Sequence, residues 1–256
     1  MIETLRLSLQ IVKRNWWVYR KDFIANISPT IADPAFVMIS LGAGLGSYVQ
    51  QVNGMSYAAY IAPGLAISTA MFTSFFETSY GFYVRMTYEN IYKAMLTTPI
   101  NAREVIMGEF LWVSAKCAVM ATSVTLVLLL FGLFTNPLNL LMIPFVGILI
   151  GLPLGAMGLL STAYVKNINQ FQTVYAFIIS PLYFFSGIFF PITQMPEYLQ
   201  WVAKSLPLYH GVVICQALYW DKDILNSWLT NGSVLVGYSL VFVLVASSKI
   251  KKNLQS

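Results

Sequence analysis

The chain has 256 residues, of which 57% are hydrophobic and only 10% are charged. Because a soluble domain usually carries about 25% charged residues, this composition excludes an ordinary soluble enzyme and indicates an integral membrane protein. The net charge of +5 does not point to nucleic acid, since the basic residues are not gathered on one soluble module.

Residues 1–22 predict an amphipathic helix that lies in the membrane interface. Trp16 and Trp17 suit headgroup depth, and Arg20 and Lys21 mark the turn into the bilayer. The apolar stripe of this helix consists of Leu5, Leu9, Val12 and Trp16. A frayed cytoplasmic tail is the alternative. The segment lacks the continuous apolar core of a cleavable signal peptide.

Six apolar segments are long enough to cross a hydrocarbon core that needs about 20 residues. Residues 34–76 contain no charged side chain, and the polar sequence at 50–54 divides them into two spans. The expected spans are 24–49, 57–83, 105–134, 138–164, 171–190 and 226–248. The sequence therefore predicts an all-α integral membrane protein with six transmembrane helices, built as one transmembrane domain over residues 1–256.

The distribution of basic residues predicts the orientation. If six helices span the membrane, twelve Lys and Arg residues lie on the side of the termini and only Lys204 and Lys222 lie on the other. The twelve are Arg6, Lys13, Arg14, Arg20, Lys21, Arg85, Lys93, Arg103, Lys166, Lys249, Lys251 and Lys252. Because positive charge is retained in the cytoplasm, both termini are expected there.

Residues 191–225 predict a helical hairpin on the external side, between the fifth and sixth spans. Pro196 can open a short amphipathic helix, and Pro207 precedes an apolar run over 208–220. That run is too short to cross the bilayer and is typical of a re-entrant or interfacial segment.

The same region carries a resemblance to a known family. Its spacing is SGxxFPxxQxP followed by LPLxH, formed by Ser186, Gly187, Phe190, Pro191, Gln194, Pro196, Leu206, Pro207, Leu208 and His210. This pattern resembles the membrane permeases of ABC exporters, in the branch of the nodulation-factor (lipo-oligosaccharide), polysaccharide and drug exporters. The resemblance continues upstream through Gly108, Glu109 and Lys116.

The resemblance implies an exporter of the bacterial inner (plasma) membrane. In such exporters two permeases, identical or similar, pair with two ATPase subunits, so a homodimer or heterodimer is expected. The implied cargo is amphiphilic: a lipo-oligosaccharide, a lipid-linked glycan or a hydrophobic drug. The direction of transport follows from the resemblance alone.

The loop 85–99 predicts a short amphipathic helix on the cytoplasmic side. Its apolar face consists of Tyr88, Ile91, Tyr92, Met95 and Leu96, with Glu89 on the polar side. The pattern alone leaves open whether this face rests on lipid or on a partner protein. The resemblance matches the loop to the coupling helix that docks on the ATPase, which makes all six residues candidate docking residues.

The chain has no GxxxxGK[ST] phosphate-binding loop. We therefore expect no enzymatic activity and no cofactor in this chain, with ATP and magnesium bound by a separate subunit. Its two cysteines, Cys117 and Cys215, have no metal-binding spacing, so no metal site is predicted.

Glu109 and Lys116 lie seven residues apart on one helix, too far for a direct contact, so each is expected to pair elsewhere. They either line a cavity or lie at the membrane boundary, with Lys116 extending toward the interface. Asp33 and Glu77 are expected near helix ends, and His210 is expected to pack rather than to act as a base.

An aromatic group in the fifth span either lines the substrate path or belongs to the aromatic belt of the interface. It consists of Tyr183, Phe184, Phe185 and Phe189. The competing functions are an ATP-independent transporter or channel, a membrane-embedded enzyme, and a structural assembly subunit. The first needs buried titratable groups at mid-membrane, and the second needs a clustered acid–base set that the sequence does not offer.

Overall fold

The computed structural model describes residues 2–44, 46, 48–49, 51–133 and 136–255, and these residues are predominantly helical. The first helices are α1 (Ile2–Lys21), α2 (Phe23–Val37), α3 (Tyr57–Phe76), α4 (Ile91–Leu96), α5 (Ala102–Leu130) and α6 (Ile143–Tyr164). They are followed by α7 (Gln170–Val174), α8 (Ser180–Phe185), α9 (Glu197–Lys204), α10 (Pro207–Trp220) and α11 (Ile224–Gln255).

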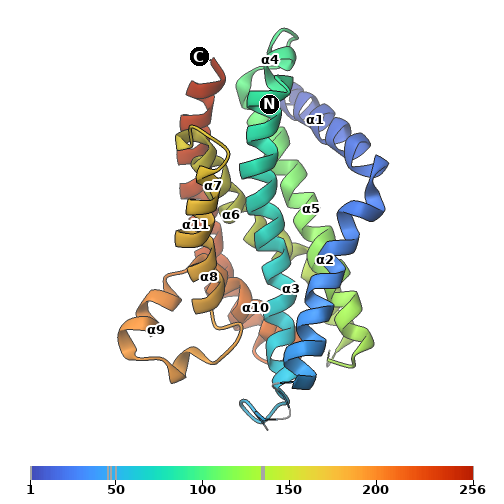
Figure 1. The fold of residues 1–256 in the computed structure, drawn as a ribbon, viewed down its shortest axis with the longest axis vertical. Coiled ribbons are helices and arrows are strands. Elements are labelled where there is room, and N and C mark those ends of the chain that lie inside the picture. Colours follow the sequence, from blue (N-terminus) through green and yellow to red (C-terminus); the bar gives the residue numbers. More distant parts are fainter. Residues whose placement is uncertain (1, 45, 47, 50, 134–135, 256) are drawn as a thin grey trace.

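The long helices run roughly parallel or antiparallel along one axis (Figure 1). The start of α1, the end of α11 and helix α4 lie at one end of the molecule, called here the α4 end. Helix α9 lies at the opposite end, the α9 end.

Five helical segments of the described residues are long and apolar enough to cross a membrane. They are Phe23–Gly42, Tyr57–Tyr88, Ala102–Leu130, Leu138–Tyr164 and Ile224–Lys251. Residues 45, 47 and 50, at the expected end of the first span, lie outside the described residues. The expected fifth span is a shorter stretch, in which α7, the π-helical residues Tyr175–Ile179 and α8 follow one another from the α4 end toward the α9 end (Figure 1).

The core forms where α3 packs between α5, α6 and α10. Helix α6 can approach α5 closely because Gly147, Gly151 and Gly155 recur every four residues on the contact face. A Cβ atom at Gly147 would lie only 2.7 Å from the carbonyl oxygen of Cys117. The glycines therefore set the distance between the two helices. Inside a membrane the hydrophobic effect does not drive helices together, so this close packing is what holds them.

Helix α1 packs on α5 through a face that the hydrophobic pattern did not indicate. Ser8, Ile11, Asn15 and Tyr19 are buried, and Gly108 of α5 leaves room for Ile11 and the backbone of Ser8. Most of the predicted apolar stripe stays uncovered in this chain, with Leu5, Leu9 and Trp16 exposed. An exposed apolar stripe suits contact with lipid.

The prediction of one helix over 85–99 is wrong. Helix α3 continues as π-helix at Glu77–Gly81 and at Val84–Tyr88, so the first part of that loop extends the transmembrane helix. The chain then turns at Asn90, whose φ of 54° is left-handed, and α4 covers only Ile91–Leu96.

Residues 191–225 form the two expected helices, α9 after Pro196 and α10 from Pro207. Ala203 of α9 and Met195, which precedes the helix, are buried, whereas Tyr198 of α9 is exposed. Helix α10 packs against α3, α6 and α11 and is largely buried.

Candidate functional site: a buried ionic network beside a cavity

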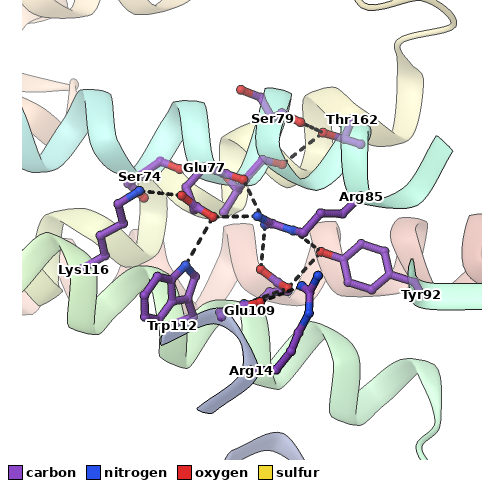
Figure 2. A network of polar contacts seen from close by, with 12 residues as sticks. Arg14, Ser74, Glu77, Ser79, Arg85, Tyr92, Glu109, Trp112, Lys116 and Thr162 are labelled. Carbon is purple, nitrogen blue, oxygen red and sulfur yellow. Dashed lines mark hydrogen bonds and ion pairs between the residues drawn. The ribbon is translucent and has the colours of Figure 1, made fainter. Parts of the chain in front are cut away.

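Three charged side chains form the centre of a network near the α4 end (Figure 2). The Arg85 guanidinium donates through Nη1 to Glu77 Oε1 at 2.8 Å and through Nη2 to Glu109 Oε2 at 2.9 Å. The side chain of Glu109 is 1% exposed, and those of Arg85 and Glu77 are 15% and 12% exposed. One arginine thus holds two carboxylates in the interior of the helix bundle.

Further donors complete the coordination of each carboxylate. Lys116 Nζ donates to Glu77 Oε2 at 2.7 Å, and Trp112 Nε1 donates to Glu77 Oε1 at 3.2 Å. Asn15 Nδ2 donates to Glu109 Oε1 at 3.1 Å. Buried charges are costly unless they are paired and hydrogen-bonded, and these donors satisfy that requirement.

Tyr92 connects α4 to this network. Its hydroxyl accepts from Arg85 Nε at 2.9 Å and donates to Glu109 Oε1 at 2.9 Å, and its ring stacks on Phe82 with centroids 4.5 Å apart. Burial and the nearby Glu109 carboxylate raise the pKa of the Tyr92 phenol well above its usual range. The phenol is therefore neutral at physiological pH and keeps the proton that it donates.

The π-helical stretches position the two network residues of α3. Glu77 begins one stretch and Arg85 lies in the other. Such widened turns free backbone carbonyl groups, and a neighbouring side chain must satisfy them inside a membrane. Thr162 of α6 does so by donating its hydroxyl to the Thr78 carbonyl oxygen at 3.1 Å (Figure 2).

Four parts of the chain therefore meet at one ionic cluster. Helix α1 supplies Asn15, the α3 continuation supplies Glu77 and Arg85, α4 supplies Tyr92, and α5 supplies the remaining members. Those α5 residues are Glu109, Trp112 and Lys116. A displacement of α4 cannot leave the cluster unchanged, because Tyr92 bonds both Arg85 and Glu109.

The structure separates the six candidate docking residues into three groups. Tyr92 is 0% exposed, so this chain buries the side chain that was predicted to face an ATPase. Tyr88 is 61% exposed and Glu89 is exposed as well. The other three, Ile91, Met95 and Leu96, are partly exposed. Of the predicted apolar face only Tyr92 is buried, and it is buried within its own chain.

A cavity of about 560 Å³ adjoins the network between α2, α3, α5 and the 175–183 stretch. Charged side chains line one part of it, among them Glu77, Arg85 and Lys116. Aromatic and small polar side chains line the rest, including Phe72, Phe76, Ser68, Thr69, Tyr175 and Tyr183. Its size and mixed lining suit an amphiphilic small molecule.

Two of the six candidate path residues, Lys116 and Tyr183, line this cavity. Glu109 does not, because it is buried within the network. Phe184, Phe185 and Phe189 are also absent from the lining: Phe184 is exposed, Phe185 packs near α9, and Phe189 packs on Tyr183 and Phe184. The expectation that Glu109 and Lys116 pair with residues elsewhere is confirmed.

Sequence reasoning missed Glu77 and Arg85 as site residues. Glu77 was expected near a helix end, and Arg85 was counted as a loop cation. The two residues are eight positions apart in the sequence. This spacing brings their side chains together only because the helix continues past Tyr83 with widened turns. His210 lies outside this site; its Nδ1 is 2.8 Å from Asn231 Oδ1, which joins α10 to α11.

Comparisons with known proteins identify the family. The model of the ABC-2 type transporter family matches residues 7–220. This chain belongs to that family. Nodulation protein J of Rhizobium leguminosarum bv. viciae is 32% identical over 246 residues, covering 96% of this chain and 94% of that protein.

Two further relatives agree with the assignment. Nodulation protein J of Rhizobium meliloti (strain 1021) is 29% identical over 96% of this chain and 93% of its own length. The inner membrane transport permease YadH of Escherichia coli (strain K12) is 22% identical over 91% of this chain and 90% of its own length. The ABC-2 chain is accordingly a multi-pass inner-membrane transport permease, and its family consists of non-catalytic membrane subunits that normally work with an ATP-binding-cassette ATPase.

Proposed function

We propose that this chain is the transmembrane subunit of an ABC exporter that moves an amphiphilic substrate out across the bacterial inner membrane, with a separate ATPase subunit as the source of energy. The single observation that carries the proposal is the bond from Tyr92 of α4 to the Arg85–Glu109 pair, 2.9 Å on each side. It gives a surface helix a direct connection to the membrane helices that line the cavity.

The topology that we propose has six spans, with residues 171–190 as the fifth and residues 191–225 as an external re-entrant hairpin. Both termini and α4 are then cytoplasmic. The presence of α4 and the chain ends at one end of the molecule supports an even number of crossings (Figure 1). The twelve basic residues on that side support the orientation.

Docking of the ATPase would involve the exposed residues next to α4. Tyr88 and Glu89 are free to make contact, with Ile91, Met95 and Leu96 beside them. Movement of the docked ATPase would shift α4, and Tyr92 would transmit the shift to Glu109 and Arg85. Because a ligand shifts a conformational equilibrium only by its differential affinity, ATP must favour one arrangement of this network.

The substrate path lies, in this proposal, at the interface of two permeases. Helix α2 is mostly exposed and borders the cavity, so a second subunit would close that side. A homodimer and a heterodimer with a similar chain both satisfy this geometry. The lipo-oligosaccharide, lipid-linked glycan and drug classes all satisfy the amphiphilic character of the cavity.

The test is a tagged purification from detergent-solubilised native membranes, followed by identification and ATPase assay of the partners. Wild type and Tyr198→Asp, an exposed tyrosine at the α9 end, are expected to retain a stoichiometric ATPase. Tyr88→Asp is expected to lose it, because a charge replaces an exposed aromatic side chain beside α4. A clean oligomer of the wild-type permease without any ATPase would contradict the proposal and favour an ATP-independent transporter or channel.

A further inference from the structure

Asp33 is a charged residue in an unusual position. It lies near the middle of the apolar segment Phe23–Gly42, and its side chain is exposed and lines the cavity. Among the described residues it has no hydrogen-bond or ion-pair partner. A carboxylate at membrane depth is costly, so its retention there points to a ligand or a watery path.

The other charged residues that line the cavity are already occupied. Glu77 pairs with Arg85 at 2.8 Å and with Lys116 at 2.7 Å. Arg85 also pairs with Glu109, and the Lys116 ammonium lies 5.1 Å from the centre of the Tyr19 ring. The paired network is neutral, because Glu77 and Glu109 balance Arg85 and Lys116. Among the described residues, Asp33 therefore adds one unpaired negative charge to the cavity wall.

Aromatic rings form a second feature of the same cavity. Phe72 packs on Tyr183 with ring centroids 5.1 Å apart, and Phe76 stacks on Tyr175 at 5.7 Å. All four rings line the cavity. The faces of aromatic rings attract cations, and a carboxylate beside an aromatic wall is complementary to a positively charged group on an apolar body.

We propose that the cavity binds a hydrophobic cation, and that Asp33 is the residue that selects for its positive charge. The apolar body lies along Phe72, Phe76 and Leu65, and the cationic head lies near Asp33. The interpretation of this binding as cargo recognition rests on the proposed function. The preference for a cation can be measured without an ATPase and without transport.

Binding to the purified full-length permease in nanodiscs tests the inference by equilibrium dialysis. The probes are tetraphenylphosphonium and tetraphenylborate, which have nearly the same shape and opposite charges. Empty nanodiscs correct for partition into lipid. Wild type is expected to prefer the cation, and Asp33→Asn is expected to lose about tenfold in affinity for the cation while keeping its affinity for the anion.

Two further variants control the interpretation. Asp33→Glu retains the charge and is expected to retain the preference for the cation. Asp22→Asn removes an exposed carboxylate that precedes α2 and does not line the cavity, and it is expected to leave both affinities unchanged.

Equal cation affinity of wild type and Asp33→Asn would overturn the inference. So would a change of oligomeric state in Asp33→Asn, because Asp33 would then pair with a second subunit. Loss of ATPase co-purification from wild type would contradict the proposed function alone, since the dialysis result does not depend on it.

Discussion

The two ends of the molecule are held together by different chemistry. Toward the α4 end, Glu77, Arg85, Glu109 and Lys116 make all three salt bridges found among the described residues. Toward the α9 end, α3 is tied to the rest of the chain by neutral groups. Tyr60 donates to the Gly187 carbonyl oxygen at 3.0 Å, and Trp220 Nε1 donates to the Ala59 carbonyl oxygen at 3.2 Å.

This difference has a mechanical consequence. A buried ionic network tolerates only arrangements in which every charge is paired, so it changes between discrete states rather than by small steps. Neutral contacts such as the stacking of Tyr60 on Trp220, with centroids 5.9 Å apart, lose less when they shift. The end that carries α4 is therefore the end suited to switching.

The largest effect is expected for Glu109→Gln. Both carboxylate oxygens of Glu109 accept hydrogen bonds, Oε1 from Asn15 and Oε2 from Arg85. The glutamine side chain replaces one of these oxygens with an NH₂ group, which then faces a nitrogen donor in either orientation. Removing one partner of a buried ion pair costs about 3–5 kcal/mol, so a loss of about that size is expected in the free energy of unfolding. Denaturation of the purified permease in mixed micelles measures it.

Glu197→Gln is the matched control, because Glu197 is exposed on α9 and has no ion pair among the described residues. It is expected to unfold like wild type. If Glu109→Gln were as stable as this control, the stability of the α4 end would not depend on its buried charges. The contrast between an ionic end and a neutral end would then be wrong.

Tyr92→Phe is expected to have a smaller effect on stability and a larger one on coupling. It removes only the hydroxyl that accepts from Arg85 and donates to Glu109, at a cost of about 1–3 kcal/mol. Because the side chain is buried, the ATPase should still co-purify. Substrate stimulation of its ATP hydrolysis should fall, and reconstituted proteoliposomes measure that response.

Tyr198→Phe removes a hydroxyl from an exposed tyrosine of α9, away from the docking residues, and is the control for this variant. It is expected to behave like wild type in the same assay. Loss of ATPase binding in Tyr92→Phe would mean that Tyr92 contacts the partner, against its burial in this chain.

The helices of the bundle could be predicted from the sequence because long apolar segments and prolines specify them locally. Pro196 and Pro207 correctly indicated the starts of α9 and α10. The short stretch at 170–185 was expected to be longer, since its apolar run continues to Phe190 although the helix ends at Phe185. Hydropathy alone does not indicate that the helix ends before the apolar run does.

The network could not be predicted in the same way. An amphipathic pattern predicts that one face of α4 is buried. It does not distinguish burial against lipid, against a partner protein or against the rest of the same chain. The pattern therefore could not show that Tyr92 is buried by its own chain. The pairing of Glu77 with Arg85 depends on π-helical turns, and no hydrophobic periodicity indicates where such turns occur.

The smallest effect is expected at the α9 end, for Trp220→Phe. Phenylalanine keeps an aromatic ring against Tyr60 but cannot donate to the Ala59 carbonyl oxygen, so one neutral hydrogen bond is lost at a net cost of about 0.5–1.5 kcal/mol. The same denaturation experiment measures it. ATP hydrolysis and its stimulation should remain as in wild type, because no charge near α4 is touched. A coupling defect as large as that of Tyr92→Phe would show that both ends switch together, and the division into an ionic end that moves and a neutral end that holds would be wrong.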